Sequence, residues 1–462
     1  MTGDTLAASP GGAPHLRRVL ALRDLIVVAA ASMAPAFSVA ASMPSMLVAA
    51  GRWTWIALVL IAVVMAMTAV GYKRLGERMR DAGSSYAWIR VAFGPETGAY
   101  GAWVLIIANL FAVLATALPA GALTLDLLAP AAAGNGLAVA LVGCAWILGT
   151  AALLWYGLRP TALLTFALLA AEIIVLAAAA GLAAGHPRTD AVAFAPAPFS
   201  WGGIAAAMAI GIWMLDGWEV AASTSEEAGG GPDVPGSGGL AGLAVTSIVL
   251  LAATWAFARI GTAAGFAAHE NDALAYLGGL LGGWWRPVLA VTLLASLAAA
   301  LQTTLVYLTR SIYAMGRDSL LPRRLGALDR RGEPAGAIVL ITVLSLVASL
   351  ATGLSPDAKG AFEFARDGTL WFLGLLFLMS AGAAVRVFAA ERSARWSGVV
   401  LPGTAVLALA GILVLALKAD DPRTRGFIAA SAIIGLPLAL WRGGVVRRAF
   451  VPGAEPRTGS RF

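Results

Sequence analysis

Apolar stretches long enough to cross a membrane recur along the whole chain of 462 residues. A transmembrane helix needs about 20 mainly apolar residues, and twelve such windows follow one another between short polar connections. The windows are 25–49, 54–72, 98–129, 137–156, 160–184, 201–225, 240–264, 287–315, 336–354, 368–390, 398–417 and 426–441. The pattern predicts an all-α polytopic membrane protein with about twelve transmembrane helices.

Composition supports this class and excludes others. Hydrophobic residues make up 60% of the chain and charged residues 12%, against roughly 25% charged residues in soluble domains. The net charge of +7 is spread thinly over short loops, so a nucleic-acid partner is not expected. The chain has no G-x-x-x-x-G-K-[ST] phosphate loop, and its three histidines and single Cys144 form no metal-binding motif. We therefore expect no ATP-hydrolysing site, no metal and no cofactor.

The basic residues indicate the orientation in the membrane. With the N-terminus inside, 23 of the 32 lysines and arginines fall on the cytoplasmic side, which favours two cytoplasmic termini. We expect a disordered cytoplasmic tail at 1–18, one transporter domain at 19–450 and a cytoplasmic tail at 451–462. The location predicted is the cell membrane. Abundant arginine and alanine beside scarce lysine favour a GC-rich genome and a bacterial inner membrane.

The first apolar window, LIVVAAASMAPAFSVAASMPSMLVAAG, contains a proline near its middle. Pro35 lacks an N–H group and its ring opposes the carbonyl four residues earlier, so the helix should break near 32–36. Broken helices at membrane depth are tolerated where they line a cavity or are buried in protein, and transporters build substrate sites there. A plain proline kink, with the freed groups met by Ser38 or a neighbouring helix, is the other interpretation.

The sixth window carries the second candidate interruption, in IWMLDGWEVAASTSEEAGGG. Gly217 lowers helix propensity, and Asp216 can compete for backbone N–H groups. Acids such as Asp216 and Glu219 are costly inside a membrane and are usually functional. The first and sixth windows are five spans apart, as corresponding positions in two five-helix inverted repeats would be.

Three motifs resemble the amino acid-polyamine-organocation transporter superfamily over nearly the whole chain. They are DGWEVAASTSEEA in the sixth window, YLTRSIYAMGRDSLLPRRL in the eighth, and the loop RMRDAGSSYAWIRVAFG after the second. The eighth-window motif is the most specific, although Ser319 replaces its usual glycine. Within these motifs we expect Arg310, Arg317 and Asp318 to have structural roles.

The resemblance implies a five-plus-five inverted-repeat fold, with repeats at about 19–185 and 198–391, discontinuous helices one and six, and two extra helices at 397–443. It implies a secondary active transporter for amino acids, proton-coupled or exchanging, that works by alternating access. A transporter of polyamines or other organic amines is the nearest alternative. A non-transporting membrane sensor or an enzyme is a different class, which would need no paired broken helices. The expected partners are the substrate, protons and the lipid bilayer.

The resemblance also implies a substrate site at the two breaks. The substrate carboxylate would meet N–H groups around the first break, and its ammonium would meet carbonyls at the sixth. The residues concerned are Ala34, Ala36, Phe37 and Ser38, then Ile212, Trp213, Met214 and Leu215, with Asp216 and Gly217 beside them. Trp213 would gate the substrate or pack in the core. Asn109 would contact the substrate or bond between helices.

Where the family often has Gly-x-Gly at the first break, this chain has Ala34-Pro35-Ala36, and Pro35 removes one donor for a carboxylate. Asp216 would pair with an amine or cap a half-helix. For Glu219, stabilising the unwound sixth helix is favoured over contact with substrate.

Glu172 is the single acid of the fifth window. It matches a position where some proton-coupled members carry a lysine that reaches the first break. We hypothesise that it carries the coupling proton; a protonated acid bonded to carbonyls of the first span is the alternative. Oxygens of Ser296, Gln302, Thr303 and Thr304 could serve a sodium-type site, although hydroxyls in membrane helices more often bond their own backbone.

Overall fold

The computed structural model describes residues 16–270, 273–354, 358–419 and 422–449. Within these ranges the chain is all-helical, and the one extended pairing is a bridge between Leu20 and Ala228. Ten helical stretches in this part of the chain are long and apolar enough to cross a membrane, and Trp201–Met214 is a shorter apolar helix. The protein is therefore a multi-pass membrane protein. The predicted C-terminal tail and most of the predicted N-terminal tail lie outside the described residues.

The predicted windows all coincide with helices. The long helices are α1 (Leu22–Ser32), α2 (Pro35–Ala50), α3 (Thr54–Arg78), α5 (Pro95–Leu128), α6 (Gly136–Trp155), α7 (Leu158–Gly185), α8 (Trp201–Met214), α10 (Val234–Phe257), α13 (Trp285–Arg317), α14 (Ala335–Gly353), α15 (Ala358–Phe388), α16 (Leu401–Ala419) and α17 (Pro422–Ala449). The short helices are α4 (Ser85–Phe93), α9 (Val220–Ser223), α11 (Ala263–Ala268) and α12 (Ala273–Leu281). The sequence patterns did not predict α4, α11 and α12. The count of twelve spans and the inverted repeat stay predictions.

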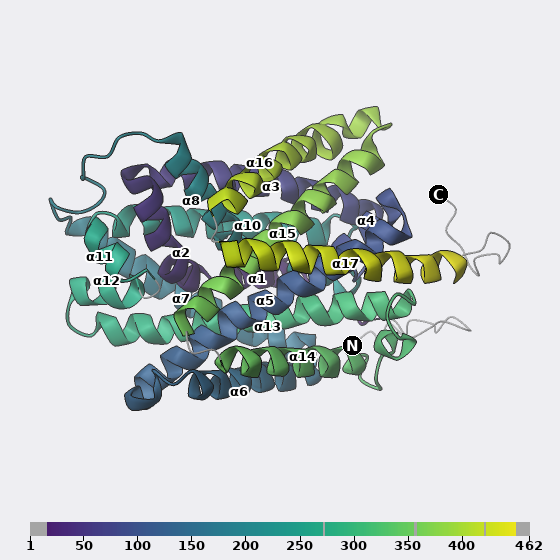
Figure 1. Cartoon of the computed structure of the whole chain (residues 1–462), viewed down its shortest axis with the longest axis horizontal. Coiled ribbons are helices and arrows are strands. Elements are labelled where there is room, and N and C mark those ends of the chain that lie inside the picture. The colour runs from purple at the N-terminus through teal and green to yellow at the C-terminus, as the bar shows by residue number, and fades with distance from the viewer. Residues whose placement is uncertain (1–15, 271–272, 355–357, 420–421, 450–462) are drawn as a thin grey trace, which may run out of the picture.

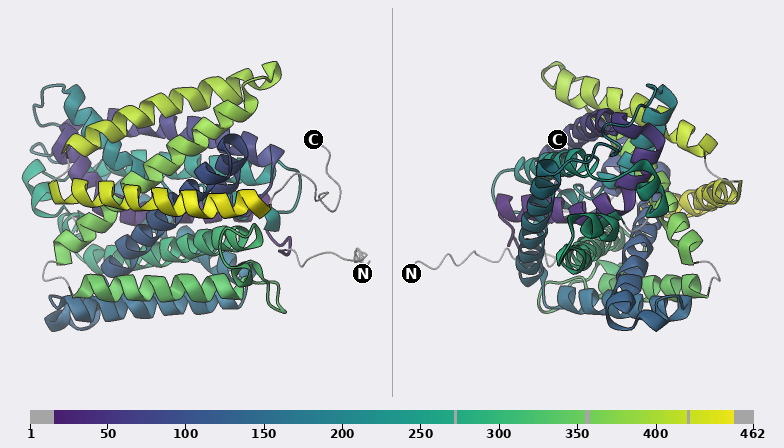
Figure 2. Two further views of the ribbon diagram at one scale, coloured as in Figure 1. Left: turned by 45° about the vertical axis from the view of Figure 1, so that its right-hand side comes forward. Right: turned by 90° about the vertical axis from the view of Figure 1, so that its left-hand side faces the viewer.

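The helices form a bundle with one main direction, and the C-terminal end of α17 lies at one end of it in Figure 1. We call that end of the bundle the terminal face and the opposite end the far face. Figure 2 shows the same bundle from its side and along its length. The C-terminal ends of α3 and α13 lie at the terminal face, whereas α7 and α15 run in opposite directions between the two faces.

Helix α5 lies at the centre of the bundle and packs against α4, α6, α13, α15 and α17. Small residues allow the closest approach: a Cβ atom added at Gly121 would lie 2.3 Å from the carbonyl oxygen of Val139. Helices in lipid associate through such close packing because lipid tails are as apolar as the side chains themselves. Helix α5 is therefore closely packed against its neighbours.

Both predicted interruptions are confirmed. The first span divides into α1 and α2 at Met33 and Ala34, and the sixth divides into α8 and α9 between Leu215 and Glu219. The hydroxyl of Ser38 donates to the carbonyl of Met33 at 2.7 Å and lies 3.3 Å from the carbonyl oxygen of Met214. The two breaks thus face each other across the middle of the bundle.

Candidate functional site

The first break is built by a left-handed residue followed by a proline. Ala34 has φ 45° and ψ 66°, which ends α1 and turns the chain into α2. Pro35 is the first residue of α2, where a missing N–H group costs nothing because the first N–H groups of a helix have no partner within it. The next two N–H groups, those of Ala36 and Phe37, must find partners elsewhere.

Side chains from two other helices supply those partners. The N–H of Ala36 donates to Oε1 of Glu172 in α7, and the N–H of Phe37 donates to Oγ of Ser296 in α13 at 3.2 Å. The Ser296 hydroxyl in turn donates to the same Glu172 oxygen at 2.6 Å. A carboxylate at this position also complements the positive end of the α2 dipole. Glu172 therefore caps α2 through an N–H group and contacts no carbonyl of the break.

The second break depends on a glycine and on its neighbouring glutamate. Gly217 has φ +106°, and its N–H donates to Oε2 of Glu219 at 2.9 Å. Glu219 is 2% exposed. Its buried carboxylate accepts a hydrogen bond from a backbone N–H group that has no partner within a helix. This contact agrees with the stabilising role favoured by the sequence.

Replacing Gly217 with alanine should destabilise the break. A Cβ atom there would lie 2.7 Å from Oγ of Ser32 and 2.8 Å from its backbone, and the positive φ disfavours any side chain. We expect a loss of about 1–3 kcal/mol and a fall in transport, measured by thermal unfolding and by uptake. Gly181→Ala is the matched control because nothing lies within 4 Å of its Cβ position. Equal stability of the two variants would contradict the expectation.

A small cavity of about 40 Å³ lies between the breaks. Its lining includes the predicted residues Ala34, Phe37, Ser38, Asn109, Trp213, Asp216 and Gly217, together with Glu219. Four further predicted residues, Ala36, Ile212, Met214 and Leu215, are fully buried and do not line it. Since a water molecule takes about 30 Å³, the walls must move apart before a solute of amino-acid size can fit.

The sequence interpretation missed part of the lining. Ala300, Thr304 and Tyr307 of α13 also face the cavity, as do Ser32 and Thr116. The spacing of 300, 304 and 307 is that of one helix face, so the polar stripe on α13 was a usable signal. Thr304 is one of the four residues with oxygens suited to a sodium-type site. Of the other oxygens considered for that site, Thr303 bonds carbonyls of its own helix and Gln302 accepts from Thr165.

The charged groups of the cavity are all acceptors. Asp216 and Glu219 contribute two carboxylates, and no arginine or lysine is among the described residues that line it. The Asn109 amide donates to the Leu105 carbonyl of its own helix at 2.9 Å. The first-break N–H groups of Ala36 and Phe37 already donate to Glu172 and Ser296. The charges of the cavity therefore suit an ammonium group, whereas a carboxylate would have to rely on hydroxyl donors such as Thr304 and Tyr307.

Trp213 separates this cavity from a larger one. Its ring packs edge-on against Phe37 and Phe362, with ring centroids 5.4 Å and 6.3 Å away. On its other side lies a cavity of about 520 Å³ between α8, α15 and α16, whose lining includes the ion-paired Arg366 and Asp367. Trp213 lines both cavities. Its position is compatible with gating as well as with packing.

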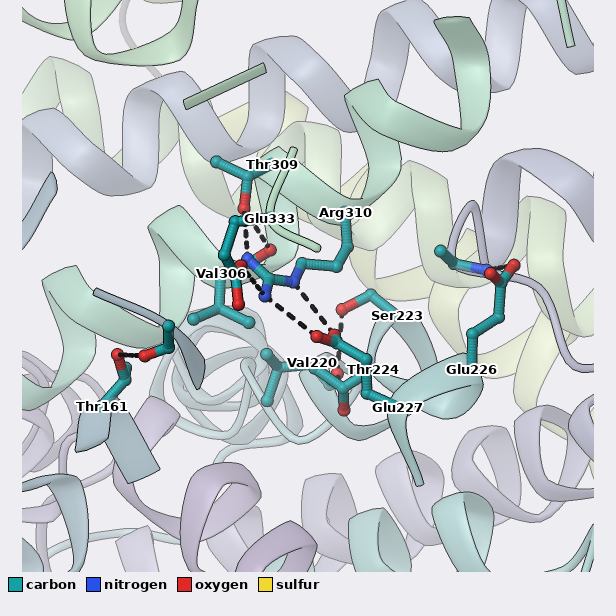
Figure 3. Close-up of polar contacts among 12 residues, drawn as sticks. Thr161, Val220, Ser223, Thr224, Glu226, Glu227, Val306, Thr309, Arg310 and Glu333 are labelled. Carbon is teal, nitrogen blue, oxygen red and sulfur yellow. Dashed lines mark hydrogen bonds and ion pairs between the residues drawn. The ribbon is translucent and has the colours of Figure 1, made fainter. Parts of the chain in front are cut away.

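Ion pairs close the terminal face. Arg310 of α13 is fully buried and bonds both oxygens of Glu227 at 3.0 Å and one oxygen of Glu333 at 2.8 Å, as Figure 3 shows. Arg317, about two helical turns further on, bonds Asp81 at 2.9 Å and Glu226 at 2.7 Å. These contacts tie α13 to three separate loops.

Two further contacts complete this closure. Asp318 pairs with Arg90 of α4 at 2.8 Å. The N–H groups of Val19 and Leu20 donate to the Glu227 carbonyl at 2.9 and 3.1 Å, which fixes the segment before α1 beside the end of the sixth span. The motif residues predicted to be structural are thus all ion-paired at the terminal face.

Closure of the terminal face should depend on pH through Asp81. Burial outweighs the attraction of Arg317 and raises the pKa of this loop carboxyl from 3.8 to about 6. The closed face therefore binds a proton more tightly than an opened face in which Asp81 meets water. The resulting stabilisation is full below about 3.8 and is lost as the pH rises through about 6.

We expect a cysteine at Ser225, which is 1% exposed beside Asp81, to become less accessible to labelling as the pH falls from 7.5 to 5. A cysteine at the exposed Ser393 corrects for the ionisation of the thiol itself. Asp81→Asn should remove the difference between the two cysteines in how their labelling changes with pH. An unchanged difference in that variant would contradict the assignment.

Comparison with known proteins gives two kinds of match. The sequence profile of a family described as "Amino acid permease" matches residues 20–438. An uncharacterized transporter of Mycobacterium tuberculosis is 28% identical over 371 residues, which cover 78% of this chain and 79% of that protein. The branched-chain amino acid permease BcaP of Lactococcus lactis is 25% identical over 393 residues, which cover 77% of this chain and 82% of that protein.

Proposed function

The chain belongs to the amino acid permease family, and from that premise we propose that it is a secondary active transporter of amino acids that works by alternating access, driven by protons or by exchange. The observation that carries the proposal is the pair of interrupted helices whose broken ends face one small cavity. Unpaired backbone groups at such breaks are the usual substrate ligands of secondary transporters. The protein is a membrane transporter; the substrate and the driving force are the proposal.

Alternating access needs a barrier on each side of the cavity that opens in turn. On the terminal side the barrier is the set of ion pairs around Arg310 and Arg317, which we take to face the cytoplasm. On the far side it is Trp213 with its aromatic neighbours. Substrate would pass from the larger cavity to the central one when Trp213 turns aside.

Glu172 offers a way to couple protons to this motion. While ionised, its carboxylate holds the N–H of Ala36 and the hydroxyl of Ser296, and so fixes the start of α2 against α7 and α13. Protonation removes the charge, and hydrogen bonds to a neutral acceptor are roughly half as strong. Loading one proton would therefore loosen α2 at the break, where the two halves of the first span must move.

A second candidate function is transport of an organic amine without a carboxylate. It is favoured by a specific observation: Pro35 has no N–H, those of Ala36 and Phe37 are occupied, and Asp216 and Glu219 both line the cavity. The charges of such a site favour a cation over an anion. The family membership favours the amino acid, and the cavity chemistry favours the amine.

Matched substrate pairs decide between the two. We expect purified protein in proteoliposomes to accumulate a labelled amino acid, such as leucine or ornithine, under an inward proton gradient. Uptake of the decarboxylated partners, isopentylamine or putrescine, with neither amino acid taken up would establish the second candidate instead. Absence of uptake and of exchange for the whole panel, with folded protein, would contradict both.

Asp216→Asn tests which group meets the ammonium. A charge-assisted hydrogen bond contributes about 1.5–3 kcal/mol, so we expect KM to rise roughly 10- to 100-fold for the transported solute. Asp126→Asn, at an exposed site near the end of α5, is the matched control and should transport normally. An unchanged KM in Asp216→Asn would place the ammonium elsewhere.

A further inference from the structure

Glu172 has one carboxylate oxygen without a partner. Oε1 accepts from Ala36 and Ser296, whereas Oε2 is buried and has no hydrogen-bond partner within the described residues. The whole residue is 0% exposed. A buried oxygen of this kind usually marks a site for water or for a proton.

Among the residues that the structure describes, no charged group lies beside this carboxyl group. Titratable residues on α7 and on the described elements packed against it are Arg159 of α7, Arg23 and Asp24 of α1, Cys144 of α6, Tyr276 of α12, and Arg286, Tyr307, Arg310, Tyr313 and Arg317 of α13, with none on α2 or α10. Arg159 is 13 residues from Glu172, about 20 Å along the helix. Arg286 and Tyr307 are ten or more residues from Ser296, about 15 Å away. Any change of charge at Glu172 must therefore be met by a proton from outside.

The central cavity does not reach Glu172. The lining on that side consists of Ala34 and Phe37, and the fully buried Ala36 and Ser296 lie between the break and the carboxyl group. A proton arriving with the substrate would have to cross the backbone of the first break. A different route is needed if Glu172 titrates during transport.

A groove between α7 and α13 provides that route. Its volume is about 380 Å³, and it is lined by Val175 of α7 and by Val291, Thr292 and Ala295 of α13, with Glu172 at its floor. Pro287, in the first turn of α13 at the far face, lies at its other end. Pro287 and Ala295 are eight positions apart, about 12 Å along α13.

Besides Glu172, the lining of the groove offers a proton relay one side-chain hydroxyl, and it offers larger cations less. Thr292 donates to the Val288 carbonyl, so its oxygen keeps lone pairs for a water molecule halfway along the groove. The other walls are apolar and offer no ligands to replace the hydration shell of a metal ion or an ammonium. A short file of water molecules can pass a proton where such cations cannot follow.

We infer that Glu172 takes up and releases its proton at the far face through the α7–α13 groove, on a path separate from the substrate path past Trp213. The inference rests on the proposed coupling role of Glu172. In the loading step a hydronium ion at the far face gives its proton to the water file, and the last water protonates Oε2. Release reverses these transfers, so no other reactant is required.

Cysteine labelling tests whether the groove holds water. In a Cys144→Ala background, Val291→Cys should react with a charged methanethiosulfonate reagent applied in water. Ile174→Cys is the control: Ile174 is 68% exposed and Val291 60%, but Ile174 does not line the groove, so it should be shielded by lipid and react at least tenfold more slowly. Equal, slow reaction at both sites would mean that lipid or packing fills the groove and would overturn the inference.

A bulky side chain in the groove tests the path itself. Val291→Trp should slow uptake driven by a proton gradient at least tenfold, while exchange of labelled for unlabelled substrate continues, because exchange does not require the proton to leave. The matched control Ile174→Trp should leave both activities unchanged. Normal proton-driven uptake in Val291→Trp would overturn the inference, and retained exchange shows that the variant is folded.

Glu172→Gln separates this inference from the proposed function. Loss of proton-driven uptake in Glu172→Gln together with normal uptake in Val291→Trp would reject the groove and keep the coupling role. Unchanged proton-driven uptake in Glu172→Gln would reject the coupling role, and with it the reason for a proton path.

Discussion

Substituting glutamine for Glu172 is expected to abolish the accumulation of substrate by a proton gradient. The amide retains an oxygen that can accept from Ala36 and Ser296, so the start of α2 keeps its cap. It cannot change charge, so the hold on α2 no longer responds to protonation. We expect gradient-driven uptake to fall at least tenfold, to the rate seen without a gradient, while exchange of substrate for substrate persists.

The measurement is uptake into proteoliposomes at several imposed pH gradients, with exchange measured in the same preparations. Glu77→Gln is the control, since Glu77 pairs with Arg74 near the terminal face and is remote from both breaks. If Glu172→Gln follows the gradient as the parent protein does, Glu172 is a structural cap alone. A lower melting temperature with unaltered coupling would give the same answer.

Local chemistry made the two breaks predictable. Pro35 and Gly217 each disfavour a continuous helix through their own backbone, so the signal lies within a few residues of the effect. The apolar windows likewise located every long helix, because a membrane span needs a long apolar run. Helices α4, α11 and α12 have nine, six and nine residues, too short for such a window, and were missed.

The partners of the first break were harder to predict. Ala36 bonds a residue 136 positions away, and Phe37 bonds one 259 positions away. Which N–H group meets which side chain depends on how α2, α7 and α13 rotate against one another, and hydropathy does not record helix rotation. The resemblance led us to expect Glu172 near the break, but not that it would occupy an N–H group assigned to the substrate. That occupancy is what brings the amine alternative forward.

A similar limit applies at the terminal face. The eighth-window motif predicted a structural role for Arg310, and the paired acids at 226–227 were visible just after the sixth window. Glu333 carried no such signal, because it lies in a polar loop where a charged residue is unremarkable. Only the fold brings it within 2.8 Å of Arg310 and leaves it mostly buried.

Removing the Arg310 guanidinium should destabilise the protein more than any other single change considered above. Arg310 is 0% exposed and neutralises Glu227 and Glu333, which are 2% and 9% exposed. Arg310→Met would keep most of the volume but leave two carboxylates buried together without a cation. Breaking a buried ion pair in this way costs about 3–5 kcal/mol, so we expect a melting temperature in detergent that is lower by several degrees.

Neutralising the stranded acids should restore much of this loss. In the triple variant Arg310→Met, Glu227→Gln, Glu333→Gln no buried charge remains, and replacing a whole buried ion group by neutral residues is often nearly neutral for stability. Arg188→Met is the control, because the Arg188–Asp190 pair is solvent-exposed and exposed pairs contribute at most about 1 kcal/mol. If the single and triple variants have the same melting temperature, the cost comes from lost packing of the arginine and not from uncompensated charge. If Arg310→Met has the same melting temperature as Arg188→Met, the ion pairs of Arg310 do not hold the terminal face closed. The barrier on that side must then be carried by the backbone hydrogen bonds between Leu20 and the segment after Glu227.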